Sequence, residues 1–174
     1  MAKSENFFIR AKVTYDDAGT FAQTEIDLGS FVNLGIAKST LLRVHGLQVG
    51  YRDSAGINFP TPAGAGTICN VAWQLTTQSQ TAIVDMTNKS VVACGGLVGA
   101  SDAQTGGIPQ LLTDVVDLNP SNFQSGYLIG VDSMFLSVDG DNDWIGDFDV
   151  CIMMECTLEN ATQATALSLS LSQV

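Results

Sequence analysis

Acidic side chains alternate with other residues in one short stretch of the chain, at Asp139, Asp141 and Asp143. Calcium binds several carboxylate and carbonyl oxygens, and alternating aspartates are typical of the start of a calcium loop. The rest of an EF-hand pattern is absent, because Trp144 stands at the glycine position and Val150 at the terminal glutamate position. Two interpretations therefore stay open: a calcium site on the three aspartates, or a plain turn between two strands. No other cofactor is predicted.

The sequence contains few residues that could form a catalytic site. His45 is the only histidine, so one chain cannot build a multi-histidine zinc site. A Ser-His-Asp or Cys-His set would have to use His45, which falls inside a predicted strand beside Arg43, and no G-x-S-x-G motif occurs. The glycines of residues 94–99 lack the spacing of a phosphate loop. We therefore predict a structural histidine and a protein that is not an enzyme.

The four cysteines, Cys69, Cys94, Cys151 and Cys156, form no CxxC pair. This spacing disfavours a zinc ribbon and a thioredoxin-like motif. Two of them, Cys69 and Cys151, lie in alternating apolar runs, where a free cysteine acts as a small core residue. Buried thiols are the first prediction, and one disulfide stays open as the alternative.

The charge of the chain is divided unevenly along its length. The net charge is −11, and all seven Lys and Arg residues lie at or before Lys89, whereas residues 90–174 carry only acidic charges. A half without Lys or Arg cannot neutralise phosphates, so direct nucleic-acid binding is not expected. Only Lys3 precedes Arg10, so we expect no basic arm and no secretory signal at the start.

A periodicity of two dominates the sequence and indicates strands. Asn6 to Tyr15 shows it clearly, with apolar residues at odd positions and largely polar residues at even positions. Because the apolar positions change parity near Gly46, a β-bulge is predicted there. The predicted strands cover residues 6–15, 20–28, 39–53, 67–76, 81–86, 90–98, 126–138 and 147–158.

The remaining segments are loops or are ambiguous. Residues 54–66 and 99–125 are predicted as long loops at the ends of the fold, although 111–118 within the second fits either a short helix or a strand. The tail alternates like a strand, yet Asn160 to Gln163 resembles a capping box, which favours a short helix beginning near Asn160. The pattern predicts one domain over residues 1–174, an all-β, jelly-roll-like antiparallel β-sandwich of about eight strands.

Surface composition suggests what such a sandwich does. The chain is 45% hydrophobic and only 14% charged, so its outer faces must carry Ser, Thr, Gln, Asn, Gly and Ala. Weakly charged surfaces suit repeated protein contacts, although an ordinary neutral β-protein fits as well. The stretch Leu41 to Asp53 and the Leu-Ser repeat at the C-terminal end resemble segments of single jelly-roll viral capsid proteins.

That resemblance implies a structural virion protein that self-assembles in many copies into a shell, together with other virion proteins. It also implies that the genome is held by another component, such as an internal membrane or a separate basic protein. Calcium on Asp139, Asp141 and Asp143 would offset carboxylate repulsion between subunits. Two alternatives stay open: a calcium-assisted carbohydrate-binding module that stacks sugars on Trp73, Trp144 or Tyr127, and a filament, tail or pilus-like subunit in an extracellular or surface assembly.

Overall fold

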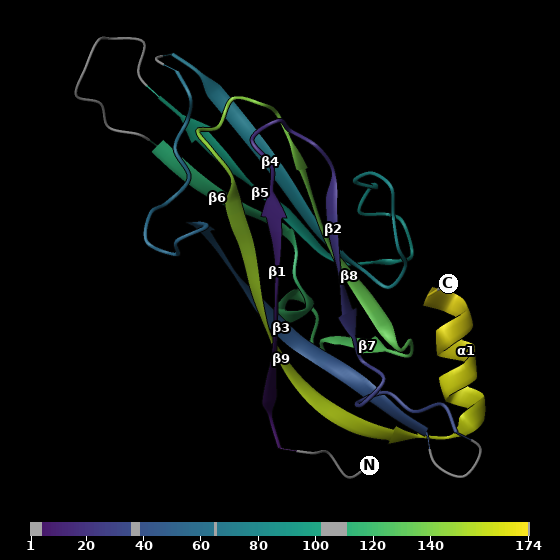
Figure 1. The fold of residues 1–174 in the computed structure, drawn as a ribbon. Helices are drawn as coiled ribbons and strands as arrows, with labels where there is room; N and C mark the ends of the chain where they lie inside the picture. Colours follow the sequence, from purple (N-terminus) through teal and green to yellow (C-terminus); the bar gives the residue numbers. More distant parts are fainter. Residues whose placement is uncertain (1–4, 36–38, 65, 102–110, 174) are drawn as a thin grey trace.

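The computed structural model describes residues 5–35, 39–64, 66–101 and 111–173. These residues form nine strands, one short 3₁₀ turn and one α-helix (Figure 1). The elements are β1 (Phe7–Tyr15), β2 (Ala22–Asp27), β3 (Ser39–Asp53), β4 (Ile68–Thr76), β5 (Val91–Ala100), β6 (Leu111–Leu118), η1 (Pro120–Asn122), β7 (Tyr127–Ile129), β8 (Ser133–Gly140), β9 (Phe148–Ala161) and α1 (Gln163–Gln173).

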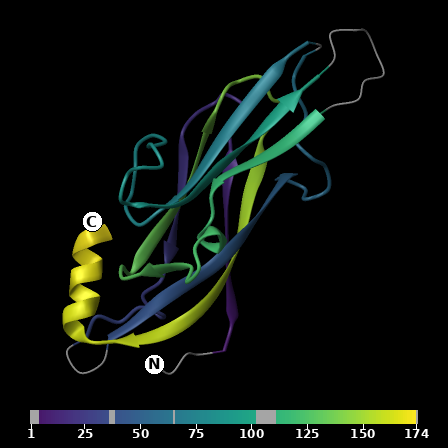
Figure 2. The same cartoon turned by 180° about the vertical axis from the view of Figure 1, so that it is seen from behind.

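The strands form two antiparallel sheets that face each other, as Figures 1 and 2 show. One sheet has the order β1-β9-β3-β7 and the other the order β2-β8-β4-β5-β6. The antiparallel pairs are nested, because β1 pairs with β9, β2 with β8, β3 with β7 and β4 with β5. This is a long hairpin rolled into two layers, which is the jelly-roll arrangement, and β6 extends the second sheet as an additional edge strand.

The core lies between the sheets and follows from the two-residue alternation. In β4 the side chains of Cys69, Val71, Trp73 and Leu75 all point inward and are buried. Tyr15 and Phe148, opposite each other on β1 and β9, pack with ring centroids 4.8 Å apart and their planes tilted by 33°, at one end of this core. The predicted all-β sandwich is therefore confirmed.

The predicted bulge lies where the sequence placed it. The pairing of β3 with β9 shifts register between Val44 and Gly46, so His45 is the extra residue. The side-chain amide of Asn119 satisfies the backbone of Leu47 next to the bulge: its Nδ2 donates to the Leu47 oxygen at 3.0 Å, and its Oδ1 accepts from the Leu47 nitrogen at 3.3 Å. Because of the extra residue, the buried core positions of β3 change from even numbers, Leu42 and Val44, to odd numbers, Leu47 and Tyr51.

The predicted strand over residues 126–138 is wrong in its continuity. The chain forms β7, leaves strand geometry at Gly130 and resumes as β8, because β7 pairs with β3 in one sheet and β8 pairs with β2 and β4 in the other. At the crossing, the Gly130 N–H donates to Gln173 Oε1 at 2.8 Å, and the Leu169 side chain lies directly over the glycine. A sheet-to-sheet crossing therefore interrupts an apolar run that looks continuous in sequence.

Residues 81–86 form no strand, which corrects a second prediction. The buried side chain of Gln74 binds this segment instead, accepting from the Val84 N–H at 2.9 Å and donating to the Ala82 oxygen at 3.3 Å. Residues 99 and 100, predicted as loop, continue β5, and the ambiguous segment 111–118 is the strand β6. Within the predicted loop over residues 99–125, residues 102–110 lie outside the described residues.

The C-terminal helix exists, but it begins later than predicted. Strand β9 continues to Ala161, so Asn160 is strand and not a helix cap. Thr162 takes that place: its Oγ1 accepts from the Thr165 N–H at 3.3 Å, and its carbonyl accepts from the Ala166 N–H at 3.0 Å. Among the described residues, no helix has the length and apolar character needed to cross a membrane.

Glycines in β5 allow close packing, which leads to a stability prediction. A Cβ at Gly95 would lie 2.3 Å from the Val115 carbonyl oxygen and 2.9 Å from the Trp73 ring, whereas a Cβ at Gly50 would have no atom within 4 Å. We expect Gly95→Ala to lower the free energy of unfolding by about 1–3 kcal/mol through overpacking. Gly50→Ala should change it by less than about 0.5 kcal/mol. Urea unfolding of both variants tests this, and equal effects would contradict it.

Candidate functional site

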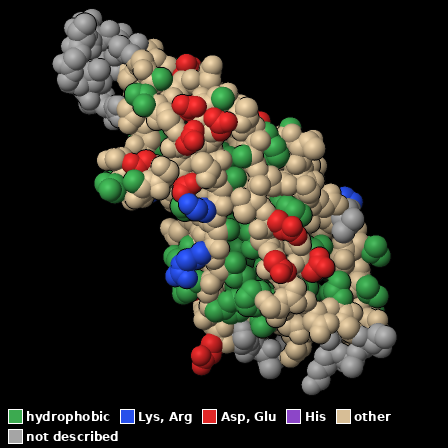
Figure 3. Space-filling model, in the orientation of Figure 1, with side chains coloured by type: hydrophobic (Ala, Val, Ile, Leu, Met, Phe, Trp, Pro, Cys, Tyr) green, Lys and Arg blue, Asp and Glu red, His purple; other side chains and the backbone are tan. Residues whose placement is uncertain are grey.

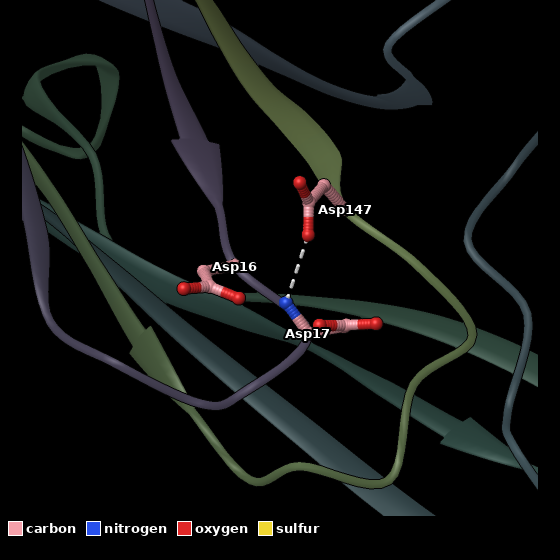
Figure 4. Close-up of side chains that lie close together, drawn as sticks. All are labelled: Asp16, Asp17 and Asp147. Atoms are coloured by element: carbon pink, nitrogen blue, oxygen red, sulfur yellow. Dashed lines mark hydrogen bonds between the residues drawn. The ribbon is translucent and has the colours of Figure 1, made fainter.

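Three exposed aspartates converge at one end of the sandwich (Figure 4). Asp16 and Asp17 follow β1 directly, and Asp147 directly precedes β9, so the pairing of Tyr15 with Phe148 brings them together. One carboxylate oxygen of each lies within 4.8 Å of the others, and the Asp17 N–H donates to Asp147 Oδ1 at 3.1 Å. Within the described residues, this is the one such group of acidic, histidine or cysteine side chains.

The turn that carries Asp16 and Asp17 is held in a specific conformation. Asp16 Oδ1 accepts from the Ala18 N–H at 2.9 Å, and Gly19 adopts a φ of +70°, which favours glycine. A side chain at Gly19 would also meet the Gly140 carbonyl oxygen at 2.8 Å, so the turn packs tightly against the end of β8. The arrangement presents carboxylate oxygens to solvent, and such oxygens could contribute to a calcium coordination sphere.

The predicted calcium ligands Asp139, Asp141 and Asp143 lie close by but are not gathered in that way. Asp139 accepts from the N–H of its neighbour Gly140 at 2.9 Å. Asp141 Oδ2 accepts from the Asn70 N–H at 2.6 Å, and its Oδ1 accepts from the Asp143 N–H at 3.4 Å. These aspartates thus shape a turn and tie it to β4, and a calcium site on them stays a prediction.

Negative charge at this end acts on Tyr15. Burial, followed by the charges of Asp141 and Asp139, raises the pKa of Tyr15 to about 12. Its hydroxyl donates to the backbone oxygen of Asp141, which a protonated phenol can do at every physiological pH. Tyr15 therefore links the core to the acidic turn.

The sequence did not single out Asp16 and Asp17 as a site. The pattern Asp-Asp-Ala-Gly predicts only a turn, and Asp147 lies 130 residues from Asp17 along the chain. Only the antiparallel pairing of the first and last strands brings the three carboxylates together. A prediction would have needed the register of β1 against β9.

A buried carboxylate lies one step further along the same pair of strands. Asp149 accepts from Lys12 Nζ at 2.6 Å and from Thr14 Oγ1 at 2.7 Å, and both donors lie on β1. Burial raises the pKa of Asp149, but the hydrogen bonds from Lys12 and Thr14 outweigh it, so the pKa is lowered overall. The folded protein therefore favours the charged form.

The other sequence-derived candidates have structural surroundings. The ring nitrogen Nε2 of His45 lies 2.9 Å from Thr157 Oγ1, beside a pocket of about 320 Å³ that Ser121 and Glu155 also line. All four cysteines are free thiols, and Cys69 and Cys156 are buried as predicted. Cys94 and Cys151 are only half-buried, so the prediction of Cys151 as a core residue is wrong. Burial raises the pKa of Cys69 to about 11 and that of Cys156 to about 12, so these two thiols stay protonated at neutral pH.

At the end of the sandwich that carries the acidic group, apolar side chains are exposed on two loops and on the first residue of β4. We call Ile57, Phe59, Ile68 and Ile145 the apolar end patch; they are 76%, 58%, 66% and 60% exposed. Backbone hydrogen bonds hold two of its segments together, from Ile145 N–H to the Thr61 oxygen at 2.8 Å and from Ala63 N–H to the Asp143 oxygen at 2.6 Å. Phe59 also stacks on the Arg52 guanidinium at 4.0 Å.

Calcium should bind where the carboxylates converge, which gives a direct test. In wild-type protein, calcium at ten times its dissociation constant should add about 1.4 kcal/mol to the free energy of unfolding. Asp147→Asn should remove this gain, and the matched variant Asp143→Asn should keep it. Thermal unfolding with and without calcium measures both. A gain lost in Asp143→Asn and kept in Asp147→Asn would instead favour the ligands predicted from sequence.

Asp149 predicts a pH dependence of stability. A lowered pKa in the folded state contributes stability above the unfolded value of about 4, and this contribution is lost as the pH falls through the folded value. At pH 7, Asp149→Asn should cost about 1–2 kcal/mol, because it weakens two hydrogen bonds to a charged acceptor. The difference between wild type and variant should shrink below pH 4. Denaturant titrations from pH 7 to 2.5 check this, with exposed Asp117→Asn as control; a constant difference would contradict it.

Comparison with known proteins leaves the site to be judged on its own geometry. No protein-family model matches the sequence, and no curated protein matches it significantly. The fold, the converging aspartates and the apolar end patch therefore carry the functional argument.

Proposed function

We propose that this protein is a structural subunit of a virion, which self-assembles in many copies into a capsid shell. The observation that carries the proposal is the combination of a jelly-roll sandwich with the apolar end patch on its loops. Jelly rolls occur in viral capsid and lectin domains, so the fold supports the proposal by analogy and the surface must distinguish these uses.

The apolar end patch favours protein contacts over a soluble, isolated existence. Large apolar side chains exposed on neighbouring loops mark interaction sites, because their burial against a partner removes them from water. The loops that carry them are tied together by backbone hydrogen bonds, so the patch needs little ordering when a partner binds. A pre-ordered apolar surface at the end of a sandwich suits repeated contacts between identical subunits.

A divalent cation has a defined role in this proposed assembly, between the carboxylates of adjacent copies. Asp16, Asp17 and Asp147 are exposed beside the end patch, so copies that meet there would bring carboxylates together. A divalent cation would offset that repulsion. The chain would then belong to the virion, with a genome held by other components.

The carbohydrate-binding alternative has weaker support. Trp73 and Trp144 are only 1% and 3% exposed, so neither ring can stack on a sugar in this conformation. Tyr127 is half-buried on the short strand β7. A filament, tail or pilus-like subunit would use the same apolar surface as a shell subunit, and imaging must separate the two.

Assembly of the purified protein tests the proposal. We expect light scattering to show large uniform particles, and negative-stain images to show closed shells. The double variant Ile57→Ser/Ile145→Ser should reduce assembly at least tenfold, because two exposed apolar side chains of the end patch are lost. The matched control is Met86→Ser, which alters an exposed apolar residue on the separate loop between β4 and β5.

Other outcomes would contradict the proposal. Filaments would favour a tail or pilus-like subunit. A protein that stays monomeric with and without calcium would exclude self-assembly, and a glycan array would then test the binding module. Full assembly of the end-patch variant would show that subunits meet elsewhere.

A further inference from the structure

An apolar groove of about 940 Å³ runs between β1 and β2. β1 is the edge strand of one sheet and β2 the edge strand of the other, so the groove follows the open seam of the sandwich. Figure 3 shows this seam as a hollow in which hydrophobic side chains are exposed. The groove is a feature of the edges and is separate from the apolar end patch.

Inward-facing side chains of both sheets form the walls of the groove. Ile9 and Ala11 on β1 and Ile26 on β2 line it. Val49 on β3 and Ile152 on β9 complete the apolar lining. Toward one end, Phe7 of β1 stacks on Phe31 with ring centroids 5.2 Å apart. Ile26 and Ile152 are buried core residues, and Ile9, Ala11 and Val49 are half-buried and pack against the core.

The two rims of the groove carry opposite charges. Arg10 and Lys12 point outward from β1, and Glu25 and Asp27 point outward from β2. In Figure 3, basic side chains lie on one side of the hollow and acidic side chains on the other. Lys12 is paired with Asp149, Glu25 accepts from Ser133 Oγ at 2.6 Å, and Asp27 accepts from the Gly29 N–H at 2.8 Å.

Arg10 is the rim cation with no ion pair among the described residues. Its guanidinium lies 5.9 Å from the centroid of the exposed Phe8 ring. The side chain of Glu25 is exposed, and among the described residues its carboxylate accepts from the neutral hydroxyl of Ser133. Arg10 and Glu25 are therefore able to pair with groups outside their own chain.

We propose that the groove is the contact with a second copy of this chain, in which the β1 rim of each copy faces the β2 rim of the other. A two-fold axis makes any such surface self-complementary, because each contact then forms twice. Here the two-fold places Arg10 of one copy opposite Glu25 of its partner, and the reverse. The apolar walls of both grooves are removed from water at the same time.

Charge complementarity selects this occupant over others. A ligand with one sign of charge would be attracted by one rim and repelled by the other, whereas a second copy presents both signs in the matching order. The inference rests on the proposed self-assembly and names the contact that forms its first unit, a two-fold dimer.

Charge exchange tests the pairing. Arg10→Glu and Glu25→Arg each place like charges across the dimer, so the concentration at which half of the chain is associated should rise roughly tenfold. The double variant Arg10→Glu/Glu25→Arg restores opposite charges and keeps the net charge of −11, so it should associate like wild type. A mixture of the two single variants should also associate, because each supplies the charge that the other lacks.

Matched controls separate the contact from net charge. Lys89→Glu changes the net charge as Arg10→Glu does, and Asp117→Arg changes it as Glu25→Arg does. Asp117 lies on β6, at the opposite edge of the sheet from β2, and Lys89 lies on the loop between β4 and β5. Neither residue lines the groove, so both controls should associate like wild type. Sedimentation velocity measures association, and thermal unfolding confirms that every variant is folded.

The outcomes distinguish this inference from the proposed function. Single variants that associate like wild type, or a double variant that stays dissociated, would overturn the groove contact while leaving self-assembly intact. Loss of association in Asp117→Arg alone would place the contact at β6 and overturn it as well. A wild-type chain that is monomeric at every concentration would overturn both proposals.

Discussion

The central position of β9 is the constraint on which the other features depend. This strand hydrogen-bonds to β1 along one edge and to β3 along the other, so it joins the first strand to the middle of the chain. Its residue Phe148 lies opposite both Tyr15 and Asp53, where the two partner strands end. The turn that begins at Asp16 and the loop that begins at residue 54 therefore leave the sandwich at the same level. One register thus places both the converging aspartates and the apolar end patch.

Local patterns predicted the strands well, because alternation reports which face of a strand is buried. β1, β3 and β4 lie within a residue or two of their predicted bounds, and the parity change at Gly46 located the bulge. The failures come from contacts that the alternation of apolar residues does not report. The strand predicted for 126–138 breaks at Gly130 because its halves join different sheets, and 81–86 is bound by the Gln74 side chain from β4. The first failure depends on strands far away in the sequence, whereas Gln74 lies only 8 and 10 residues from Ala82 and Val84, and there a polar side-chain contact decides the structure.

Folding determines where the unevenly distributed charges of the sequence lie on the surface. Basic residues are confined to the first half of the sequence, and β1 brings two of them, Arg10 and Lys12, to an edge strand. The acidic half folds back beside it, since Asp149 on β9 pairs with Lys12. A chain with a net charge of −11 repels its own copies, so close association requires surfaces where charge is absent or balanced. The apolar end patch offers uncharged side chains beside the converging aspartates, and the groove between β1 and β2 carries both signs of charge.

The groove itself follows from the size of a few inward-facing side chains. β1 and β2 are consecutive strands in opposite sheets, and the turn at 16–20 holds them together at one end. Near that turn, the large side chains of Val13 and Tyr15 on β1 are buried and fill the space between the sheets. Further from it, Ala11 on β1 and Thr24 on β2 are small, and both line the groove. Larger residues at these two positions would close the seam with the chain's own atoms. The sandwich instead keeps an apolar hollow with charged rims, and in water such a surface is stabilised by a partner that covers it.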